Sequence, residues 1–389
     1  MDVKFSELLE EPIRSGISRP SRTRGHGVPM INMREIFAFD FIRDGEADLV
    51  PVDEGELKKF GLHEGDLLFA RQSLSWDGAG KVSIVEALAT PTVFESHLLR
   101  ARVCSEVASP QFLYYFFKAG PGRRAVEGII QQVAAAGIRS KELANLLLRL
   151  PGVEEQRSIA EVLDFFDRKI AANRAATESA DRLVRALYGR LQPSNRTFDQ
   201  IAVNIRESVA SNDIAIDELY VGLEHLDRRS LWLDGRGVGA DVASSKSRFA
   251  AGDVLFGKLR PYFHKVALAP SAGVCSTDIL VLRAREPRHI ALVAAGASSD
   301  EVVAAAVQAS NGTKMPRAKW ADIATCSVPD PDSADVREFC AVVDPLAERA
   351  ARAVEENLRL AATRDELLPL LMSGKITVKD AEKTVEEVV

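Results

Sequence analysis

One heptad pattern occurs twice in this chain, and this repetition constrains the fold more than any other feature. Between Glu154 and Leu191, apolar or neutral residues recur at alternating steps of four and three, the a/d rhythm of a coiled-coil seam. Adding 180 to each position preserves the phase at all ten positions, with Arg364 as a charged exception. The two series are Ile159, Leu163, Phe166, Ile170, Asn173, Thr177, Ala180, Val184, Leu187 and Leu191, and Phe339, Val343, Leu346, Ala350, Ala353, Asn357, Leu360, Arg364, Leu367 and Leu371.

The duplicated phase favours two long helices packed against each other. A helix of about 38 residues spans roughly 57 Å, more than a small domain needs. Pro193 and Gly374 are stop signals after the two helices, and Pro345 is expected to kink or restart the second helix near its beginning. The alternative is a pair of amphipathic helices that cover separate globular cores.

The segments outside these helices are also related. Gly65-Asp-Leu-Leu-Phe69 matches Gly252-Asp-Val-Leu-Phe256 at an offset of 187. Residues 33–36 match residues 223–226 at an offset of 190, and small drifts in offset are explained by loop insertions. The last set of matches, at an offset of 178, pairs Arg139, Lys141 and Pro151 with Arg317, Lys319 and Pro329.

Local patterns within these segments predict an α+β fold. Short apolar runs at 66–70, 82–85, 253–256 and 278–282 are broken by Gly, Pro, Ser and Asp and are typical of strands, whereas 110–128 and 287–309 have a helical pattern. We predict two α/β globules and two long helices packed as an antiparallel coiled coil, in a pseudo-twofold duplicated architecture. The predicted boundaries are 1–153 for the first globule, 154–192 for the central helix, 193–332 for the second globule and 333–376 for the C-terminal helix.

Composition indicates a soluble protein, with 46% hydrophobic and 27% charged residues. No apolar run approaches the roughly 18 residues of a membrane span, and the N-terminal residues lack a signal-peptide pattern, so a cytoplasmic location is expected. The four scattered cysteines are expected to be buried free thiols rather than disulfides or zinc ligands: Cys104, Cys275, Cys326 and Cys340.

Charge is distributed unevenly. The net charge of −6 does not indicate a nucleic-acid binder, but residues 12–34 contain five arginines and no acid. Residues 244–265 contain five lysines and arginines against Asp253 alone. Such windows can be ordinary solvated loops, yet their matching positions in the two halves favour a shared anionic ligand.

Catalytic patterns are weak. The glycine-rich stretches at 235–239 and 78–81 lack the spacing of dinucleotide- and phosphate-binding loops, and the six histidines never pair at metal-ligand spacing. The chain also lacks the Asn/Asp-Pro-Pro-Tyr tetrapeptide of amino-methyltransferases. No catalytic or metal-binding residue is therefore predicted.

Two basic globules joined by stiff helices suit a bipartite ligand such as duplex DNA, whose major-groove faces recur about every 34–36 Å. Arginine and lysine anchor phosphates or read guanine, while glutamine suits adenine. The candidate DNA contacts lie in the two basic windows and in the loops after the matched strands: Arg19, Arg22, Arg24, Arg71, Gln72, Ser73, Lys81, Lys246, Arg248, Lys258, Arg260, Tyr262 and Lys265.

The motifs, taken in order, resemble the specificity subunit of a type I restriction–modification enzyme. The motifs are Gly137-Ile-Arg-Ser-Lys-Glu-Leu143, Leu150-Pro151, Glu154-Glu-Gln156, the stretch from Gly252 to Tyr262, and Leu370-Leu-Met-Ser-Gly-Lys-Ile376. The resemblance implies two target-recognition domains, each reading half of an interrupted DNA site, with the paired helices as a spacer.

The same resemblance implies two partner proteins. Methyltransferase subunits, two copies in that family, would dock on the helices, and a motor-nuclease subunit would complete the complex. S-adenosylmethionine, ATP and magnesium would bind those partners, leaving this chain non-catalytic and without a cofactor of its own. The implied docking residues are Glu155, Gln156, Phe166, Ile170 and Leu346.

The sequence departs from the family's pattern at one place, and three alternative functions stay open. The second repeat has Val336-Arg337 where the first has Gln156-Arg157, which weakens the expected symmetry of partner docking. The alternatives are a recognition subunit of another multisubunit DNA-modification system, a coiled-coil interaction scaffold that does not bind DNA, and a self-contained methyltransferase or nuclease.

Overall fold

The computed structural model describes residues 2–45, 47–118, 120–132, 135–309 and 315–388. The chain divides into two compact units: unit 1 contains residues 1–168 and 360–389, and unit 2 contains residues 169–359. Each unit therefore combines one globule with segments of both long helices.

Among the described residues no single helix has the length and apolar character to cross a membrane, although the bent pair Pro287–Ala297 and Asp300–Gln308 meets both criteria together.

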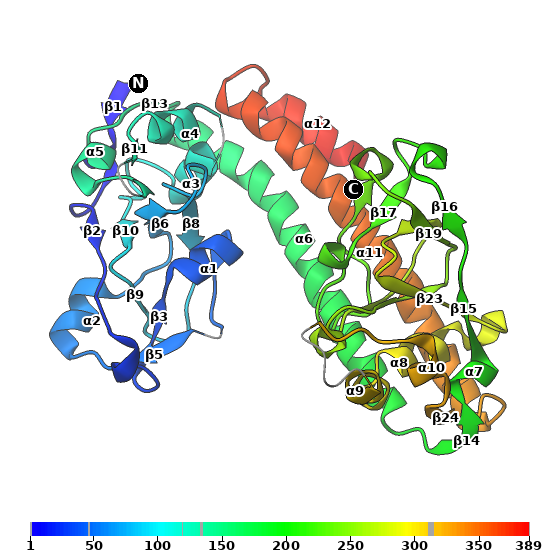
Figure 1. Cartoon of the computed structure of the whole chain (residues 1–389). Helices are drawn as coiled ribbons and strands as arrows, with labels where there is room; N and C mark the ends of the chain where they lie inside the picture. The colour runs from blue at the N-terminus through cyan, green and yellow to red at the C-terminus, as the bar shows by residue number, and fades with distance from the viewer. Residues whose placement is uncertain (1, 46, 119, 133–134, 310–314, 389) are drawn as a thin grey trace. The chain divides into compact units, whose positions relative to one another are not determined.

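Unit 1 is built around a sheet with the strand order β2-β10-β6-β8-β4 (Figure 1). On one face, Leu68 and Ala70 of β6 join a core with Ile36. On the other face, Phe69 packs edge-on against Phe5 and Phe117, with ring centroids 6.2 and 5.2 Å away. The elements are β1 Asp2–Lys4, β2 Arg14–Ser15, β3 Val28–Ile31, α1 Met33–Ala38, β4 Phe41–Ile42, β5 Asp48–Val50, α2 Glu54–Phe60, β6 Leu67–Ala70, β7 Gln72–Ser73, β8 Val82–Val85, β9 Val93–Phe94, β10 Leu98–Ala101, α3 Pro110–Lys118, α4 Gly120–Glu127, β11 Gln131–Gln132, β12 Ala136–Gly137, α5 Ser140–Ala144 and β13 Leu147–Arg149.

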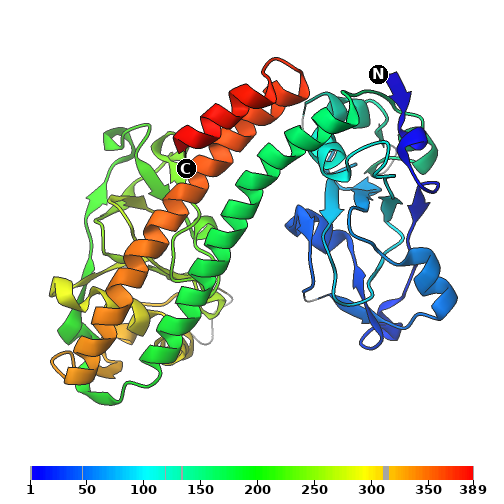
Figure 2. The same cartoon turned by 180° about the vertical axis from the view of Figure 1, so that it is seen from behind.

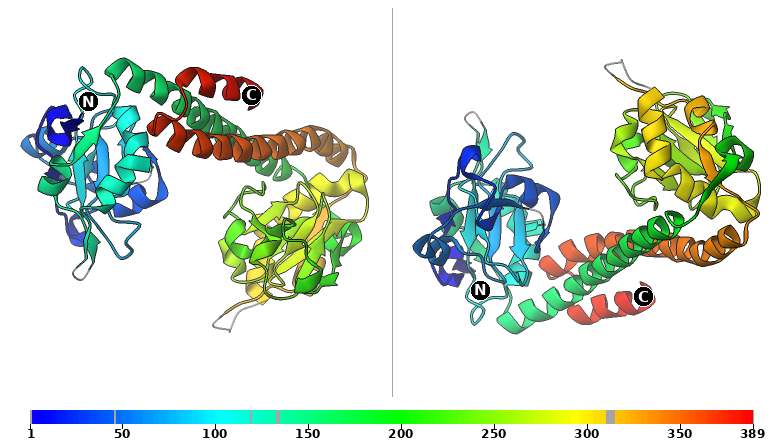
Figure 3. Two further views of the ribbon diagram at one scale, coloured as in Figure 1. Left: turned by 90° about the horizontal axis from the view of Figure 1, so that it is seen from above. Right: turned by 90° about the horizontal axis from the view of Figure 1, so that it is seen from below.

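Unit 2 has a sheet with the order β15-β23-β20-β21, covered on one face by α8, which Figure 3 shows in yellow. Val254 and Phe256 of β20 belong to the core on that face, which also contains Phe339 of the C-terminal long helix. Leu255 points to the opposite face and a second core. The elements are β14 Pro193–Thr197, α7 Phe198–Ile201, β15 Ala202–Ile205, β16 Ser208–Val209, β17 Leu219–Val221, β18 Gly237–Val238, β19 Lys246–Phe249, β20 Val254–Gly257, β21 Val266–Leu268, β22 Gly273–Cys275, β23 Ile279–Ala284, α8 Ile290–Ala297, α9 Asp300–Ala309, α10 Trp320–Ala324 and β24 Ser327–Pro329.

Strand pairing confirms the predicted duplication. β6 pairs antiparallel with β8 and β10, and β20 pairs in the same way with β21 and β23. The parallel pair β3·β9 has its counterpart in β17·β22. All four predicted strands and both predicted helical regions are present.

The predicted match at an offset of 178 is wrong by two positions. The residues before α5 and α10 are Arg139 and Lys319, and β13 and β24 begin at Leu147 and Ser327. Both of these pairs have an offset of 180 in the sequence numbering. Similar residue types two positions out of register produced the error, since Arg139 corresponds in the fold to Lys319 and not to Arg317.

The repeated Gly-Asp pair forms the same tight turn before the central strand of each unit. Gly65 has φ +84° and Gly252 has φ +82°, a left-handed conformation that glycine adopts without strain. Their amides donate to the carbonyls of Val85 and Ala269, at 2.8 and 2.9 Å. The motif is therefore a conformational requirement of the fold.

The aspartates of these turns, Asp66 and Asp253, are each only 1% exposed. Arg102 donates two hydrogen bonds to Asp66, at 2.8 and 2.7 Å, and Arg283 donates two to Asp253, both at 2.7 Å. A buried carboxylate is tolerated because a charged, bidentate partner and backbone amides satisfy it.

The two long helices are α6 Val153–Tyr188 and α11 Ala334–Met372. Their segments in unit 2 run antiparallel and side by side (Figure 2), since Tyr188 packs against Phe339 while Asn173 donates to Asn357 at 3.0 Å. Both helices lie where the heptad pattern predicts them. The fold class is therefore confirmed.

The charged exception in the seam, Arg364, has a buried partner in unit 1. Its guanidinium contacts the carboxylate of Asp167, which also accepts a hydrogen bond from the Tyr115 hydroxyl at 2.6 Å. The side chains of Arg364 and Asp167 are 15% and 7% exposed. Burial beside Asp167 raises the pKa of Tyr115, so the hydroxyl stays a donor.

The continuous helix α11 excludes one of the two outcomes predicted at Pro345, a restart of the helix. The helix does not restart at Pro345, which lies on an exposed face where water can reach the carbonyl of Ala341 that proline leaves without a donor. Gly374 follows Met372 with φ +67° and donates to the Leu371 carbonyl, as expected for a C-terminal glycine.

A further helix, α12 Val378–Val388, was not predicted. Its start carries a capping box: Thr377 accepts from the amide of Asp380, whose carboxylate accepts from the amide of Thr377. The Thr-x-x-Asp spacing was the available signal in the sequence.

Replacing Asp66 by Ala should lower the free energy of unfolding by roughly 3–5 kcal/mol, because Arg102 would keep its charge in a largely buried position without its bidentate partner. Urea denaturation of the full chain measures the loss. Glu106→Ala, at an exposed position in the same unit, should change stability by less than about 0.5 kcal/mol. Equal effects of the two variants would contradict the structural role of the turn.

Arg364→Leu should also destabilise the chain by roughly 3–5 kcal/mol, since it leaves the Asp167 carboxylate buried without a countercharge. Adding Asp167→Asn keeps an acceptor for Tyr115 and should restore stability to within about 1 kcal/mol of the wild type. A double variant no more stable than the single one would show that the charge pair is not the reason for the loss.

Candidate nucleic-acid interface

The loops that follow the central strands β6 and β20 occupy equivalent positions. The amide of Arg71 donates to the carbonyl of His97 at 2.8 Å, and its carbonyl accepts from Ile138 at 2.9 Å. Lys258 repeats both bonds, with Asp278 at 2.8 Å and Ala318 at 3.0 Å. Each unit thus presents one loop from the same point of its sheet.

In unit 1 this loop presents unpaired polar side chains. Arg71 and Gln72 are exposed, and neither side chain has a hydrogen-bond or ionic partner among the residues that the structure describes. Ser73 is half-buried, and its hydroxyl accepts from the amide of Ser75 at 3.2 Å. Lys81 is half-buried too, with its amine bound to the Phe37 carbonyl at 3.0 Å. Within the described part of the chain Arg71 and Gln72 are therefore free for a ligand, whereas Lys81 mainly supports the loop.

In unit 2 the loop is bent by two residues in the left-handed region, Arg260 with φ +51° and His264 with φ +55°. The short 3-10 turn Pro261–Phe263 lies between them. Arg260 is exposed and Tyr262 is 52% exposed. This bend turns an arginine and a tyrosine outward together.

The other predicted lysines of this loop are used internally. The amine of Lys258 donates to the Thr277 carbonyl and that of Lys265 to the Leu223 carbonyl, both at 2.6 Å. Burial lowers the pKa of Lys258. These two lysines hold the base of the loop.

Lys246 and Arg248, two of the predicted DNA contacts, have partners within unit 2. Lys246 is only 7% exposed, and its amine binds the Ser244 carbonyl and hydroxyl at 2.9 Å. Arg248 is paired with Glu218 at 2.7 Å. Their charges, which sequence analysis assigned to DNA, are satisfied within the globule.

The arginine-rich window at 12–34 is similarly neutralised. Arg19 binds both carboxylate oxygens of Glu56 at 2.6 Å, and Arg24 pairs with Asp48. Of the three predicted contacts here, Arg22 is the exposed one, and it has no partner among the described residues. The acids that pair with Arg19 and Arg24 lie outside residues 12–34. Counting charges within this window therefore overestimated the positive charge available to an anionic ligand.

Arg228 is a cation beside this loop that the sequence analysis did not include among the candidate DNA contacts. Its guanidinium lies 4.1 Å from the ring centroid of Phe263, and that of Arg260 lies 6.0 Å from the same ring. The adjacent pair Arg228-Arg229 was a weak signal, because the sequence cannot show that it folds back onto the loop.

The C-terminal end of this loop is anchored by His264, which is 3% exposed. Its Nε2 donates to the Ser298 carbonyl at 2.6 Å, and Nδ1 lies 3.6 Å from Asp300. Burial and the charges of Arg185 and Arg229 lower the pKa of His264 below its ordinary 6.5, although the Ser298 carbonyl and Asp300 act in the opposite direction.

The predicted docking residues divide into buried and exposed groups. Gln156, Phe166 and Ile170 are at most 7% exposed, and the Gln156 amide is engaged by Ser109 and Pro151. Leu346 is half-buried against the core of unit 2. The first three are therefore not available on the surface for a partner. Glu155 is exposed.

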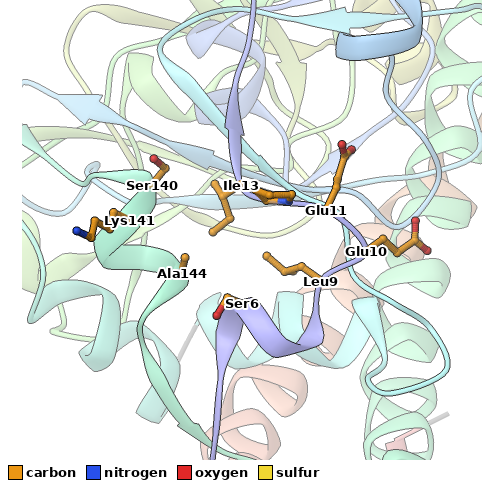
Figure 4. A pocket seen from close by; sticks show the side chains of 9 residues that line it. Ser6, Leu9, Glu10, Glu11, Ile13, Ser140, Lys141 and Ala144 are labelled. Atoms are coloured by element: carbon orange, nitrogen blue, oxygen red, sulfur yellow. The ribbon is translucent and has the colours of Figure 1, made fainter.

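A hollow of about 370 Å³ in unit 1 does not involve the predicted residues (Figure 4). Leu9, Ile13 and Ala144 line it, and Figure 4 shows the Lys141 amine pointing away from it. Glu11 at its rim is already paired with Arg100 and Arg102.

Within the described ranges, no group of three or more His, Cys, Asp or Glu side chains is placed to hold a metal ion.

All four cysteines are free thiols, as predicted, but only Cys275 and Cys340 are buried. Burial raises the pKa of Cys275 to about 12 and that of Cys340 to about 11, which leaves both thiols protonated at neutral pH. Cys104 and Cys326 are half-buried.

Comparison with known proteins finds that part of the chain is similar to one family. Residues 22–180 match the family model described as the type I restriction modification DNA specificity domain. The chain is 26% identical over 159 residues to the EcoKI specificity subunit of Escherichia coli, covering 40% of this chain and 34% of that protein. It is 20% identical over 401 residues to the MjaIX specificity subunit of Methanocaldococcus jannaschii, covering 92% and 88%.

The extent of these matches varies. The chain spans about a third to a half of the first relatives that it matches, and most of the MjaIX subunit. Among solved structures, the type I restriction-modification S subunit from M. genitalium has a TM-score of 0.59 at 14% identity, with 95% of each chain covered. That likeness concerns the fold.

The buried His264 predicts a pH dependence of stability. Because its folded pKa is lowered, the unfolded state binds the proton more readily, so stability is fully present above pH 6.5 and falls as the pH drops below that value. Urea denaturation at pH 7.5 and 5.5 measures this loss. His264→Asn, which tolerates the left-handed backbone and can still donate to Ser298, should reduce the difference. An unchanged difference would mean that other groups cause it.

Proposed function

Since residues 22–180 match the type I specificity family, we propose that the chain is the specificity subunit of such an enzyme and that each unit reads one half of an interrupted DNA site. The observation that supports this most directly is the pair of equivalent loops after β6 and β20. Each presents an exposed arginine, Arg71 or Arg260, beside a second exposed side chain, Gln72 or Tyr262.

The chemistry of these side chains suits base recognition. Arginine donates two hydrogen bonds to the O6 and N7 acceptors of guanine, and glutamine pairs with the N6 and N7 groups of adenine. A free guanidinium also attracts phosphates before a specific site is found. The internally paired cations, Lys258 and Lys265 among them, keep the loops in shape for this contact.

The long helices would bind the partner subunits. Phe166 is buried in the seam of α6, whereas its neighbour Phe165 is 39% exposed. Glu155, nearer the start of the same helix, is exposed as well. We propose these exposed positions, rather than the seam, as docking points for methyltransferase subunits. Those partners, with a motor-nuclease, would carry S-adenosylmethionine, ATP and magnesium, and this chain would supply no catalytic group.

Arg260→Ala should relax recognition of one half of the site and weaken binding by roughly 1–3 kcal/mol, the discrimination carried by a bidentate contact. Arg71→Ala should do the same for the other half only. Binding of the full chain to duplexes with either half altered, measured by fluorescence anisotropy, distinguishes the two. If both half-sites lost discrimination equally in either variant, one unit would not read one half.

Mapping genomic methylation in cells with and without the gene tests the function as a whole. An interrupted, asymmetric methylated motif should disappear when the gene is deleted and return when it is restored. A deletion that leaves every methylated motif in place would contradict the proposal. Salt-insensitive binding, or none, by the purified chain would instead favour an interaction scaffold.

A further inference from the structure

The loop between β7 and β8 in unit 1 ends in an apolar tip that the described chain leaves uncovered. Leu74 is 101% exposed, the largest exposure among the large hydrophobic residues described, and Trp76 is 43% exposed. Phe37 and Phe39, at the end of α1, are 42% and 59% exposed. Leu74 gains little stability from the fold in this position, which indicates an external contact.

The base of this loop is held firmly. Arg123 donates to the carbonyls of Asp77 and Ala79, both at 3.0 Å. Gly80 has φ +69°, and its amide donates to the Ala70 carbonyl at 2.8 Å. A Cβ added at Gly78 would lie 2.9 Å from the Phe37 ring, so the loop rests directly on the end of α1. The tip is therefore projected by a fixed base.

The surroundings of the tip favour nucleic acid over an apolar partner. Arg71 and Gln72 immediately precede the loop and are exposed and unpaired in the described structure. Lys81 follows it, with its amine 5.8 Å from the centre of the Phe37 ring. Asp77 is the single acid between Arg71 and Lys81. An apolar residue flanked by base-reading and cationic groups matches the side chains that wedge between base steps.

The equivalent loop of unit 2 carries an exposed ring at nearly the same place. Arg71 and Lys258 occupy equivalent positions. Tyr262 lies four residues after Lys258, whereas Leu74 and Trp76 lie three and five residues after Arg71. Tyr262 is 52% exposed and lies edge-on to Phe263, with centroids 4.8 Å apart. An outward apolar group beside the polar readers is thus common to both loops.

We propose that Leu74 inserts between two stacked base pairs of the bound duplex and that Trp76 stacks on a base exposed by that step. This inference rests on the proposed function and adds a contact through base stacking to the contacts through base edges. Inserting a side chain costs the free energy of unstacking two base pairs, and the new contacts with the bases offset that cost. Stacking of an aromatic side chain on a base is worth about 1–3 kcal/mol per base.

The test uses the full chain and a duplex that carries the methylated motif, with 2-aminopurine substituted at each adenine of the half-site in turn. Wild-type protein should raise 2-aminopurine fluorescence several-fold at one step, where stacking is broken. The emission of Trp76, taken as the difference between wild type and Trp76→Phe, should be quenched on binding. Leu74→Ala should remove the 2-aminopurine signal and weaken binding about tenfold.

Matched controls separate the wedge from general effects of surface change. Leu147→Ala removes another exposed leucine of unit 1, 69% exposed, and should leave the fluorescence and the affinity unchanged. Trp76→Ala should weaken binding while Trp76→Phe, which retains an aromatic face, largely restores it. Thermal unfolding of Leu74→Ala and Leu147→Ala should match the wild type, because both side chains are largely exposed, and Trp76→Phe controls for the partly covered ring of Trp76.

Three results would overturn the inference, and they differ from one another. If the wild type binds the duplex tightly but neither 2-aminopurine nor Trp76 emission changes, the wedge is absent and the proposed function stands. If the wild type binds no duplex at all, both fail. Loss of methyltransferase binding by Leu74→Ala, with DNA binding intact, would show that the tip is a protein contact and would also reject the wedge.

Discussion

The ion pair that each buried aspartate makes beneath its Gly-Asp turn is the interaction on which both units depend. Asp66 with Arg102, and Asp253 with Arg283, connect the turn before the central strand to the neighbouring strand. A one-residue shift of the central strand would move each of its side chains to the opposite face of the sheet. The same shift would separate the carboxylate from its arginine. The same strand leads into the exposed loop, so the pair fixes where Arg71 and Lys258 leave the sheet.

The long helices are part of the cores as well as of a coiled coil. In unit 2, Val184 of α6 and Phe339, Val343 and Ala350 of α11 belong to the same apolar cluster as the central strand. The loop with Arg260 and Tyr262 is therefore connected to the helices through a continuous packed interior. His264 adds a polar connection, since its Nε2 donates to the Ser298 carbonyl and lies 3.4 Å from the guanidinium of Arg185 of α6. The loop is therefore attached to a packed core that includes both helices.

Repetition made much of this fold predictable. Heptad phase located both long helices, and the Gly-Asp copies located β6 and β20, because periodicity and turn chemistry are local properties. The individual site residues were less predictable. Lys246 and Arg24 are cations of the right kind, but Ser244 and Asp48 satisfy them, and such pairing depends on tertiary contacts. Leu74 was overlooked because an apolar residue in sequence gives no indication of whether it is covered.

The contact of Arg364 with Asp167 has a consequence for hybrid genes. The two residues are far apart in the chain, yet they share one buried site in unit 1. A chimera joined before Val153 imports a foreign globule and keeps both members of the pair from one parent. A chimera joined beyond Arg168 takes Asp167 from one parent and Arg364 from the other. Whether a hybrid chain keeps a matched pair thus depends on the position of the crossover, and compatible parents are those that agree at residues 167 and 364.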